Sequence, residues 1–139
     1  MKKFNYISSA KRTLKIESDS IKAIASQLDN SFTKLCDAVM NGKGKFVIMG
    51  VGKSGHIAQK ISATLSSTGT TSIFIHPTEA AHGDIGMIDK KDIILLISNS
   101  GETDEIINII PSLKRHGKKI ASLTGNNKST IAKSADIKI

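Results

Sequence analysis

After about residue 44, the sequence alternates short apolar runs with stretches whose apolar residues have helical spacing. The apolar runs have the length of strands and number five, at 45–49, 71–76, 92–98, 119–124 and 136–139. Helices are predicted between them, at about 55–67, 103–116 and 129–134. This alternation is typical of a parallel sheet with helices on both faces. We therefore expect an α/β fold with a five-stranded parallel sheet, in which the run IILLI is the central strand.

Two helices are predicted before this alternating part. Apolar residues between Ile7 and Leu28 recur every three or four positions, so they form one stripe on a long helix. A second helix is expected to begin with Ser31 as its N-cap and to end at Gly42. Residues 1–42 are thus predicted to be N-terminal helices and residues 43–139 the α/β core, and 139 residues is the usual size of one domain.

Composition argues against several classes of protein. No apolar run approaches the roughly 18 residues that cross a bilayer, and the single cysteine, Cys36, cannot form an internal disulfide. The net charge of +8 comes mostly from lysines near the two ends, whereas segment 46–112 is slightly acidic and the chain has one tyrosine and four phenylalanines. The sequence therefore indicates neither of two common features of nucleic-acid-binding proteins, aromatic side chains that stack on bases and an arginine-rich groove. We expect a cytoplasmic protein that binds neither nucleic acid nor a membrane.

The first candidate binding segment is GVGKSG at 50–55, directly after the first predicted strand. Parallel sheets bind ligands beyond the carboxyl ends of their strands. A dinucleotide site would need an acidic residue after the second strand, and a Walker loop would need glycine where Val47 stands. What remains is the affinity of glycine amides and a helix start for an anion, with Gly52, Ser54 and Gly55 as candidate phosphate-binding residues. A turn that merely packs a helix on a strand is the alternative.

The second candidate segment is SNSGET at 98–103, after the most apolar strand. Its hydroxyl and amide side chains suit a phosphate monoester, which makes Ser98, Asn99, Ser100 and Thr103 candidate phosphate ligands. The alternative is ordinary helix capping by Ser100 or Thr103.

Ionisable residues that could move protons follow the same edge. The segment 76–84 is expected to be a long loop in which His82 either transfers protons or is hydrogen-bonded in a turn. Pro77 argues against the continuous helix that would gather His76 and His82 around a metal, so no metal is predicted. Glu105, near the start of a helix and opposite Lys53, suits proton transfer on a sugar phosphate, although the helix dipole alone would favour a carboxylate there.

The motifs GVGKSGHIAQK, HPTEAAHGDIGMI, ISNSGETDEI and SADI closely resemble the sugar isomerase (SIS) domain of the arabinose-5-phosphate isomerases, over nearly the entire chain. The resemblance implies one SIS domain over residues 1–139 with a three-layer, flavodoxin-like sandwich fold. It also implies an enzyme that interconverts ribulose 5-phosphate and arabinose 5-phosphate, a step in the synthesis of the acid sugar of lipopolysaccharide or capsule. It implies no cofactor and a homo-oligomer, a tetramer or dimer. It implies that phosphate binds among Ser54, Ser98, Ser100 and Thr103, and that Lys53, His82 and Glu105 are the active-site residues.

Members of that family continue past the last strand into a loop with a glutamate, a helix, an HPGG-type segment with a histidine, and paired CBS modules. These segments do not occur in the sequence, so we expect a domain truncated at its C-terminal side whose sheet exposes apolar surface there. The sequence does not decide between a fragment of a longer protein and a naturally short protein. Two alternative functions also stay open: a non-catalytic sugar-phosphate-binding module, and an amino-sugar or hexulose-phosphate enzyme of the same fold.

Overall fold

The structure is a computed structural model that describes residues 4–115 and 119–139. The chain divides into two compact units, residues 1–30 and residues 31–139. The first holds one helix, and the second holds the sheet and the other helices.

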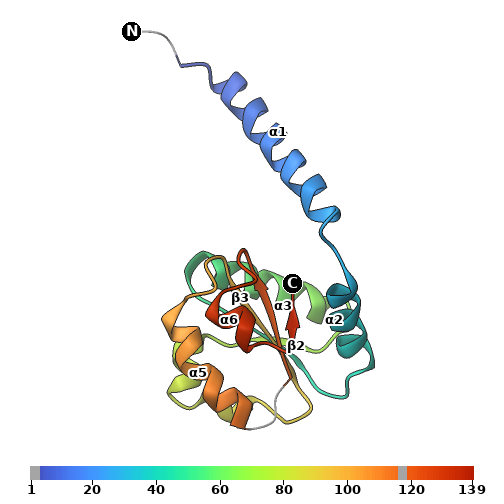
Figure 1. The fold of residues 1–139 in the computed structure, drawn as a ribbon, viewed down its shortest axis with the longest axis vertical. Coiled ribbons are helices and arrows are strands. Elements are labelled where there is room, and N and C mark those ends of the chain that lie inside the picture. Colours follow the sequence, from blue (N-terminus) through green and yellow to red (C-terminus); the bar gives the residue numbers. More distant parts are fainter. Residues whose placement is uncertain (1–3, 116–118) are drawn as a thin grey trace. The chain divides into compact units, whose positions relative to one another are not determined.

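Helix α1 (Tyr6–Ala25) makes up most of the first unit (Figure 1). Asn5 caps it, because its side-chain oxygen accepts a hydrogen bond from the backbone N–H of Ser8 at 2.9 Å. The predicted stripe lies on this helix up to Ile24, whereas Leu28 lies beyond its end. No residue of α1 is buried, and the side chain of Ile21 is 68% exposed.

The second unit is built on a five-stranded parallel sheet, as predicted. Its strands are β1 (Phe46–Gly50), β2 (Ser72–Phe74), β3 (Ile93–Ser98), β4 (Lys119–Thr124) and β5 (Ile137–Lys138). Their order across the sheet is β2-β1-β3-β4-β5, and every pair of neighbours is parallel. The five predicted strands are therefore confirmed, and β3 is central and buried throughout.

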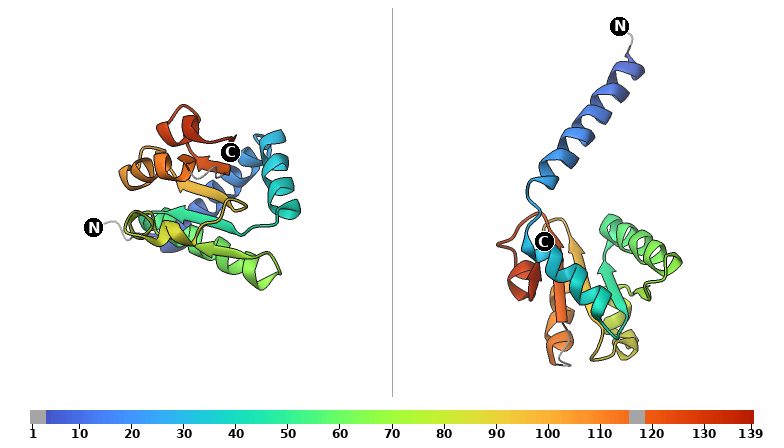
Figure 2. Two further views of the ribbon diagram at one scale, coloured as in Figure 1. Left: turned by 90° about the horizontal axis from the view of Figure 1, so that it is seen from below. Right: turned by 90° about the vertical axis from the view of Figure 1, so that its right-hand side faces the viewer.

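Helices cover both faces of this sheet, as the layers in Figure 2 show. They are α2 (Asn30–Asn41), α3 (Gly52–Ser67), α4 (Pro77–Ala81), α5 (Asp104–Arg115), α6 (Thr130–Ser134) and the short 3-10 helix η1 (Asp84–Met87). Alternate residues of β1 and β3 face opposite layers: Val47 and Ile94 pack with α4, α5 and α6, and Ile48 and Leu95 pack with α2 and α3. The predicted three-layer α/β fold is confirmed.

The sequence prediction of a loop over 76–84 is wrong, because the segment contains α4. Pro77 stands in the first turn of α4, where its fixed φ and missing N–H are well tolerated, and His76 is the N-cap. The predictions also placed two helix starts late. Helix α2 begins at Asn30, so Ser31 is not its N-cap, and α3 begins at Gly52. The last residue of the predicted helix 103–116 lies outside the described residues.

The apolar residues of the last two strands of the second unit differ in exposure. Ile137 of β5 is buried, and Leu123 of β4 is 37% exposed. Leu35 of α2 belongs to the same buried cluster as Ile137, so both lie on the face of the sheet that packs with α2 and α3. Within the described part of the chain, no helix is long and apolar enough to cross a membrane.

Candidate functional site

The two candidate phosphate segments lie side by side at the carboxyl edge of the sheet. Strands β1 and β3 are neighbours, although β2 lies between them in the sequence. Gly50, the last residue of β1, is the register partner of Ile97, which precedes Ser98 at the end of β3. The chain leaves β1 toward β2 on one side and leaves β3 toward β4 on the other. Such a point of divergence is where open parallel sheets bind ligands.

Glycines bring the start of α3 close to the end of β1. A Cβ atom on Gly50 would lie 2.8 Å from the carbonyl oxygen of Ser54, and a Cβ on Gly55 would lie 2.8 Å from the carbonyl oxygen of Gly50. Gly52 has a φ of +56°, which favours glycine. The N-cap of α3 is Val51, whose side chain makes no capping hydrogen bond. The first N–H groups of α3 therefore stay available to an anion, and the helix dipole adds positive potential.

The hydroxyl groups of the second segment form a cluster. The side-chain oxygens of Ser98 and Thr103 lie 2.7 Å apart, and those of Ser98 and Ser100 lie 3.5 Å apart. The backbone N–H of Gly101 donates to the Ser98 hydroxyl at 3.0 Å, and that of Glu102 donates to the Ser100 hydroxyl at 3.1 Å. These bonds organise the loop itself. They differ from the capping of α5 that was the alternative interpretation, because both N–H groups precede that helix.

The same loop is joined to the connection between β4 and α6. The carbonyl of Asn99 accepts from the N–H of Gly125 at 3.1 Å, and the Glu102 carboxylate accepts from the N–H of Thr130 at 2.9 Å. The hydrogen bonds from Thr130 hold the pKa of the exposed Glu102 carboxyl below its usual value. Sequence reasoning did not assign Glu102 a role, because its partner is 28 residues away and the sequence carries no sign of the pairing.

The three candidate catalytic residues stand on separate elements near this edge. Lys53 lies in the first turn of α3, Glu105 in the first turn of α5, and His82 is the C-cap of α4. All three are exposed. Among the described residues, their side chains form no hydrogen bond or ion pair, whereas the hydroxyl groups of Ser98, Ser100 and Thr103 are already clustered.

The SIS domain family model matches residues 39–139, which is most of the chain and nearly all of the second unit. The chain belongs to the SIS domain family.

Curated relatives of this SIS domain protein are arabinose 5-phosphate isomerases. It is 47% identical to the enzyme KdsD of Pseudomonas aeruginosa over 97% of the chain, and 50% identical to KpsF of Escherichia coli O6:H1 over 94% of the chain. The chain covers 41% and 40% of these two proteins, so it spans less than half of their length.

Solved structures share the fold of this SIS domain protein. A protein of Escherichia coli CFT073, solved in complex with arabinose 5-phosphate, is 42% identical with a TM-score of 0.84, and the match covers 98% of this chain and 74% of that one. A structure from Bacteroides fragilis is 35% identical with a TM-score of 0.91, and the match covers 97% of this chain and 72% of that one.

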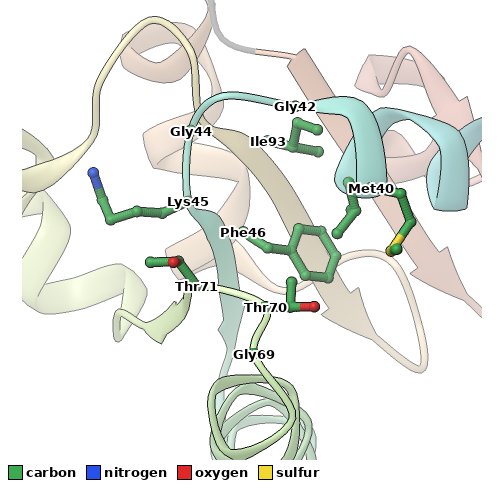
Figure 3. Close-up of a pocket in the computed structure, with 10 residues that line it drawn as sticks. Met40, Gly42, Gly44, Lys45, Phe46, Gly69, Thr70, Thr71 and Ile93 are labelled. Carbon is green, nitrogen blue, oxygen red and sulfur yellow. The ribbon is translucent and has the colours of Figure 1, made fainter.

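A pocket of about 250 Å³ in the SIS domain lies at the opposite, amino-terminal edge of the sheet (Figure 3). It is lined by Met40 at the end of α2, by Phe46 and Ile93 at the starts of β1 and β3, and by Thr70 and Thr71 before β2. None of the sequence-predicted site residues lines it. Since ligands of parallel sheets bind at the carboxyl edge, we do not count this pocket as part of the candidate site.

Beside that pocket, Lys45 and Asp92 stabilise the amino-terminal edge. The Lys45 ammonium lies 3.0 Å from the carboxylate of Asp92 and 3.2 Å from that of Asp89. Burial alone would raise the pKa of Asp92, but the N–H groups of Asp89 and Lys45 and the Lys45 ammonium together hold it below its usual value. The bond to Asp92 raises the pKa of Lys45. This cluster joins the starts of β1 and β3, so its role is structural.

Proposed function

We propose that this SIS domain forms the sugar-phosphate site of an aldose–ketose isomerase that interconverts ribulose 5-phosphate and arabinose 5-phosphate. The observation that carries the proposal is the hydroxyl cluster of Ser98, Ser100 and Thr103 next to the uncapped start of α3. A phosphate monoester needs several donors and little net charge, and both segments supply them. The identity to isomerases of arabinose 5-phosphate and the complex of a relative with that sugar phosphate support this substrate class.

In the proposed reaction, the phosphate holds the open-chain sugar while a proton moves between its first two carbons. A base removes the proton from C2 of arabinose 5-phosphate, which gives an enediolate, and a proton then adds at C1 while O2 loses its proton and O1 gains one. The product is ribulose 5-phosphate, and atoms balance without a cofactor. We assign Glu105 as the acid or base, Lys53 as the stabiliser of the enediolate charge, and His82 to ring opening or proton relay.

The exposure of the candidate catalytic residues favours a second possibility, a sugar-phosphate-binding module without turnover. In the described part of the chain, Lys53, His82 and Glu105 form no hydrogen bond or ion pair with one another, while the hydroxyl cluster is already formed. Incubating the chain with arabinose 5-phosphate, and measuring both binding and the formation of ribulose 5-phosphate, separates the two functions. Turnover supports the isomerase, and binding without turnover supports the module.

The role of Lys53 is tested by Lys53→Ala. Because the ammonium would stabilise charge that develops in the transition state, we expect turnover to fall at least about a hundredfold. Lys60→Ala is the matched control, since Lys60 is also an exposed lysine of α3 but lies two turns further along. Undiminished isomerisation by Lys53→Ala would rule out this assignment.

We also propose that the chain acts in the cytoplasm as a homo-oligomer, a dimer or tetramer, in the synthesis of the acid sugar of lipopolysaccharide or capsule. The apolar stripe of α1 is exposed over its whole length, which suits burial against a second copy. We expect Ile21→Asp, on the stripe, to lower the mass measured by light scattering at micromolar concentration. Arg12→Glu, on the opposite side of α1, should leave it unchanged; a strict monomer would contradict the proposal.

A further inference from the structure

The hydroxyl loop is fastened to the start of α6 at more than one point. The carbonyl of Gly101 accepts from the N–H of Ile131 at 3.1 Å, and the carboxylate of Glu102 accepts from the N–H of Thr130 at 2.9 Å. Of these two bonds, the second uses a side chain on the loop. It can therefore be removed without altering the loop backbone.

The loop and α6 also pack closely, with no space between Gly101 and the N-cap of α6. Gly101 has a φ of +69°, and a Cβ atom there would overlap the side chain of Ser129. Ser129 is buried and caps α6 through a bond from the N–H of Ala132. If Ser129 moved away from Gly101, its capping hydrogen bond with the N–H of Ala132 would break. The start of α6 therefore restrains the position of the loop.

Glu102 joins this support to the hydroxyl cluster. Its N–H donates to the Ser100 hydroxyl at 3.1 Å, while its carboxylate accepts from Thr130. One residue is therefore bonded to a candidate phosphate ligand at its backbone and to α6 at its side chain. The Glu102 carboxylate and an incoming phosphate are both negatively charged and would repel each other. The hydrogen bond to Thr130 holds the carboxylate at α6.

We propose that Glu102 is a positioning residue of the phosphate site, which holds the Ser98–Thr103 loop in its binding conformation through the N–H of Thr130. The inference rests on the proposed function, because it takes this loop to be the phosphate site. Glu102 itself does not touch the phosphate. Its contribution is geometric, so an uncharged side chain with an oxygen at the same place fulfils it.

The first test compares Glu102→Ala with Glu102→Gln. Glutamine keeps an acceptor oxygen for Thr130 and removes the charge, whereas alanine removes both. We expect Glu102→Ala to weaken binding of arabinose 5-phosphate about fivefold, and Glu102→Gln to bind as tightly as the unaltered chain or more tightly. Circular dichroism before each titration verifies that the variant is folded.

The second test removes the other partner. Thr130 is the first residue of α6 and Ser129 before it is extended, so proline is well tolerated at this position, and Thr130→Pro deletes both the N–H and the hydroxyl that bond to the Glu102 carboxylate. Thr130→Pro should also weaken binding about fivefold. If both substitutions remove the same interaction between Glu102 and Thr130, the double variant binds no more weakly than either single variant.

The outcomes separate this inference from the proposed function. If the unaltered chain binds neither arabinose 5-phosphate nor inorganic phosphate, the proposed function fails and the inference fails with it. If the unaltered chain binds and Glu102→Ala binds equally well, the positioning role is overturned while the function stands. The role is likewise overturned if Glu102→Gln loses as much affinity as Glu102→Ala, or if the losses of the two single variants multiply in the double variant.

Discussion

The side-chain oxygens of Ser98 and Thr103 lie 2.7 Å apart, although Ser98 ends the central strand and Thr103 immediately precedes α5. This hydrogen bond folds the intervening residues back, so the Ser98 hydroxyl also accepts from the N–H of Gly101. Ser98 is buried, whereas Ser100 is exposed. The arrangement has a buried base and an open rim of donors, which is what a site for the phosphate of a small substrate requires.

Ser98→Ala should weaken both the fold and the binding of phosphate. The substitution leaves the N–H of Gly101 without its acceptor at a buried position, so we expect the free energy of unfolding to fall by about 1–2 kcal/mol. Loss of a donor at the base of the site should weaken arabinose 5-phosphate binding about tenfold. Denaturant unfolding and a binding titration measure the two effects, and unchanged affinity would show that the cluster is not the phosphate site.

Ser122→Ala is a matched control with the opposite expected effect on stability. Ser122 lies in β4 and is fully buried, yet its hydroxyl has no hydrogen-bond partner among residues 4–115 and 119–139. Removing an unpaired buried hydroxyl should leave the free energy of unfolding unchanged or raise it by about 1 kcal/mol. Phosphate affinity should not change, and a clear loss of stability would show that this hydroxyl has a partner.

Two glycines with positive φ should respond differently to alanine. Gly52 has a φ of +56° and open space around it, so Gly52→Ala should cost about 1–2 kcal/mol from backbone strain alone. Gly101 has a φ of +69° and also lies against Ser129, so overlap adds to strain and Gly101→Ala should cost about 2–4 kcal/mol. Thermal or denaturant unfolding of the two variants measures this difference. Equal costs would mean that the contact between Gly101 and Ser129 is loose.

The stability of the SIS domain should fall in acid partly because of Asp92. Its pKa is lower in the folded than in the unfolded chain, so its contribution is fully present above the unfolded value, about 4, and is lost as pH falls through the folded value. Lys45 has a raised pKa, so its effect on stability has the opposite dependence on pH. The stability that Lys45 contributes is lost as pH rises through its pKa in the folded chain, above about 10.5. Unfolding free energies measured across the acid range should fall less steeply for Asp92→Asn than for the unaltered chain. Parallel curves would contradict this.

The sequence predicted the sheet and the position of the phosphate segments because both depend on local pattern. Buried parallel strands are continuously apolar, as in IILLI, and glycine or hydroxyl residues at strand ends are unusual enough to recognise. The first residues of the helices were predicted less accurately than the positions of the strands. Pro77 argues against a helix that continues from His76, and α4 indeed begins at Pro77; spacing alone does not identify the helix that starts there, because proline favours the first turn of a helix.

Interactions between residues far apart in sequence were not predicted. Glu102 bonds to Thr130 across 28 residues, and Asp92 bonds to Lys45 across 47, so neither pairing produces a periodic signal. The roles of Lys53, His82 and Glu105 stay predictions, since among the described residues their exposed side chains form no hydrogen bond or ion pair with one another or with the hydroxyl cluster.

The proposed phosphate site is tested most directly by titrating the 139-residue chain with arabinose 5-phosphate and following its backbone amide signals by NMR. If phosphate binds at the carboxyl edge, the signals of Gly52, Lys53, Ser100 and Gly101 shift first and saturate together. The signals of Thr70 and Thr71, at the pocket on the opposite edge, then stay in place. Shifts confined to Thr70 and Thr71, or no shifts at all, would contradict the proposed site.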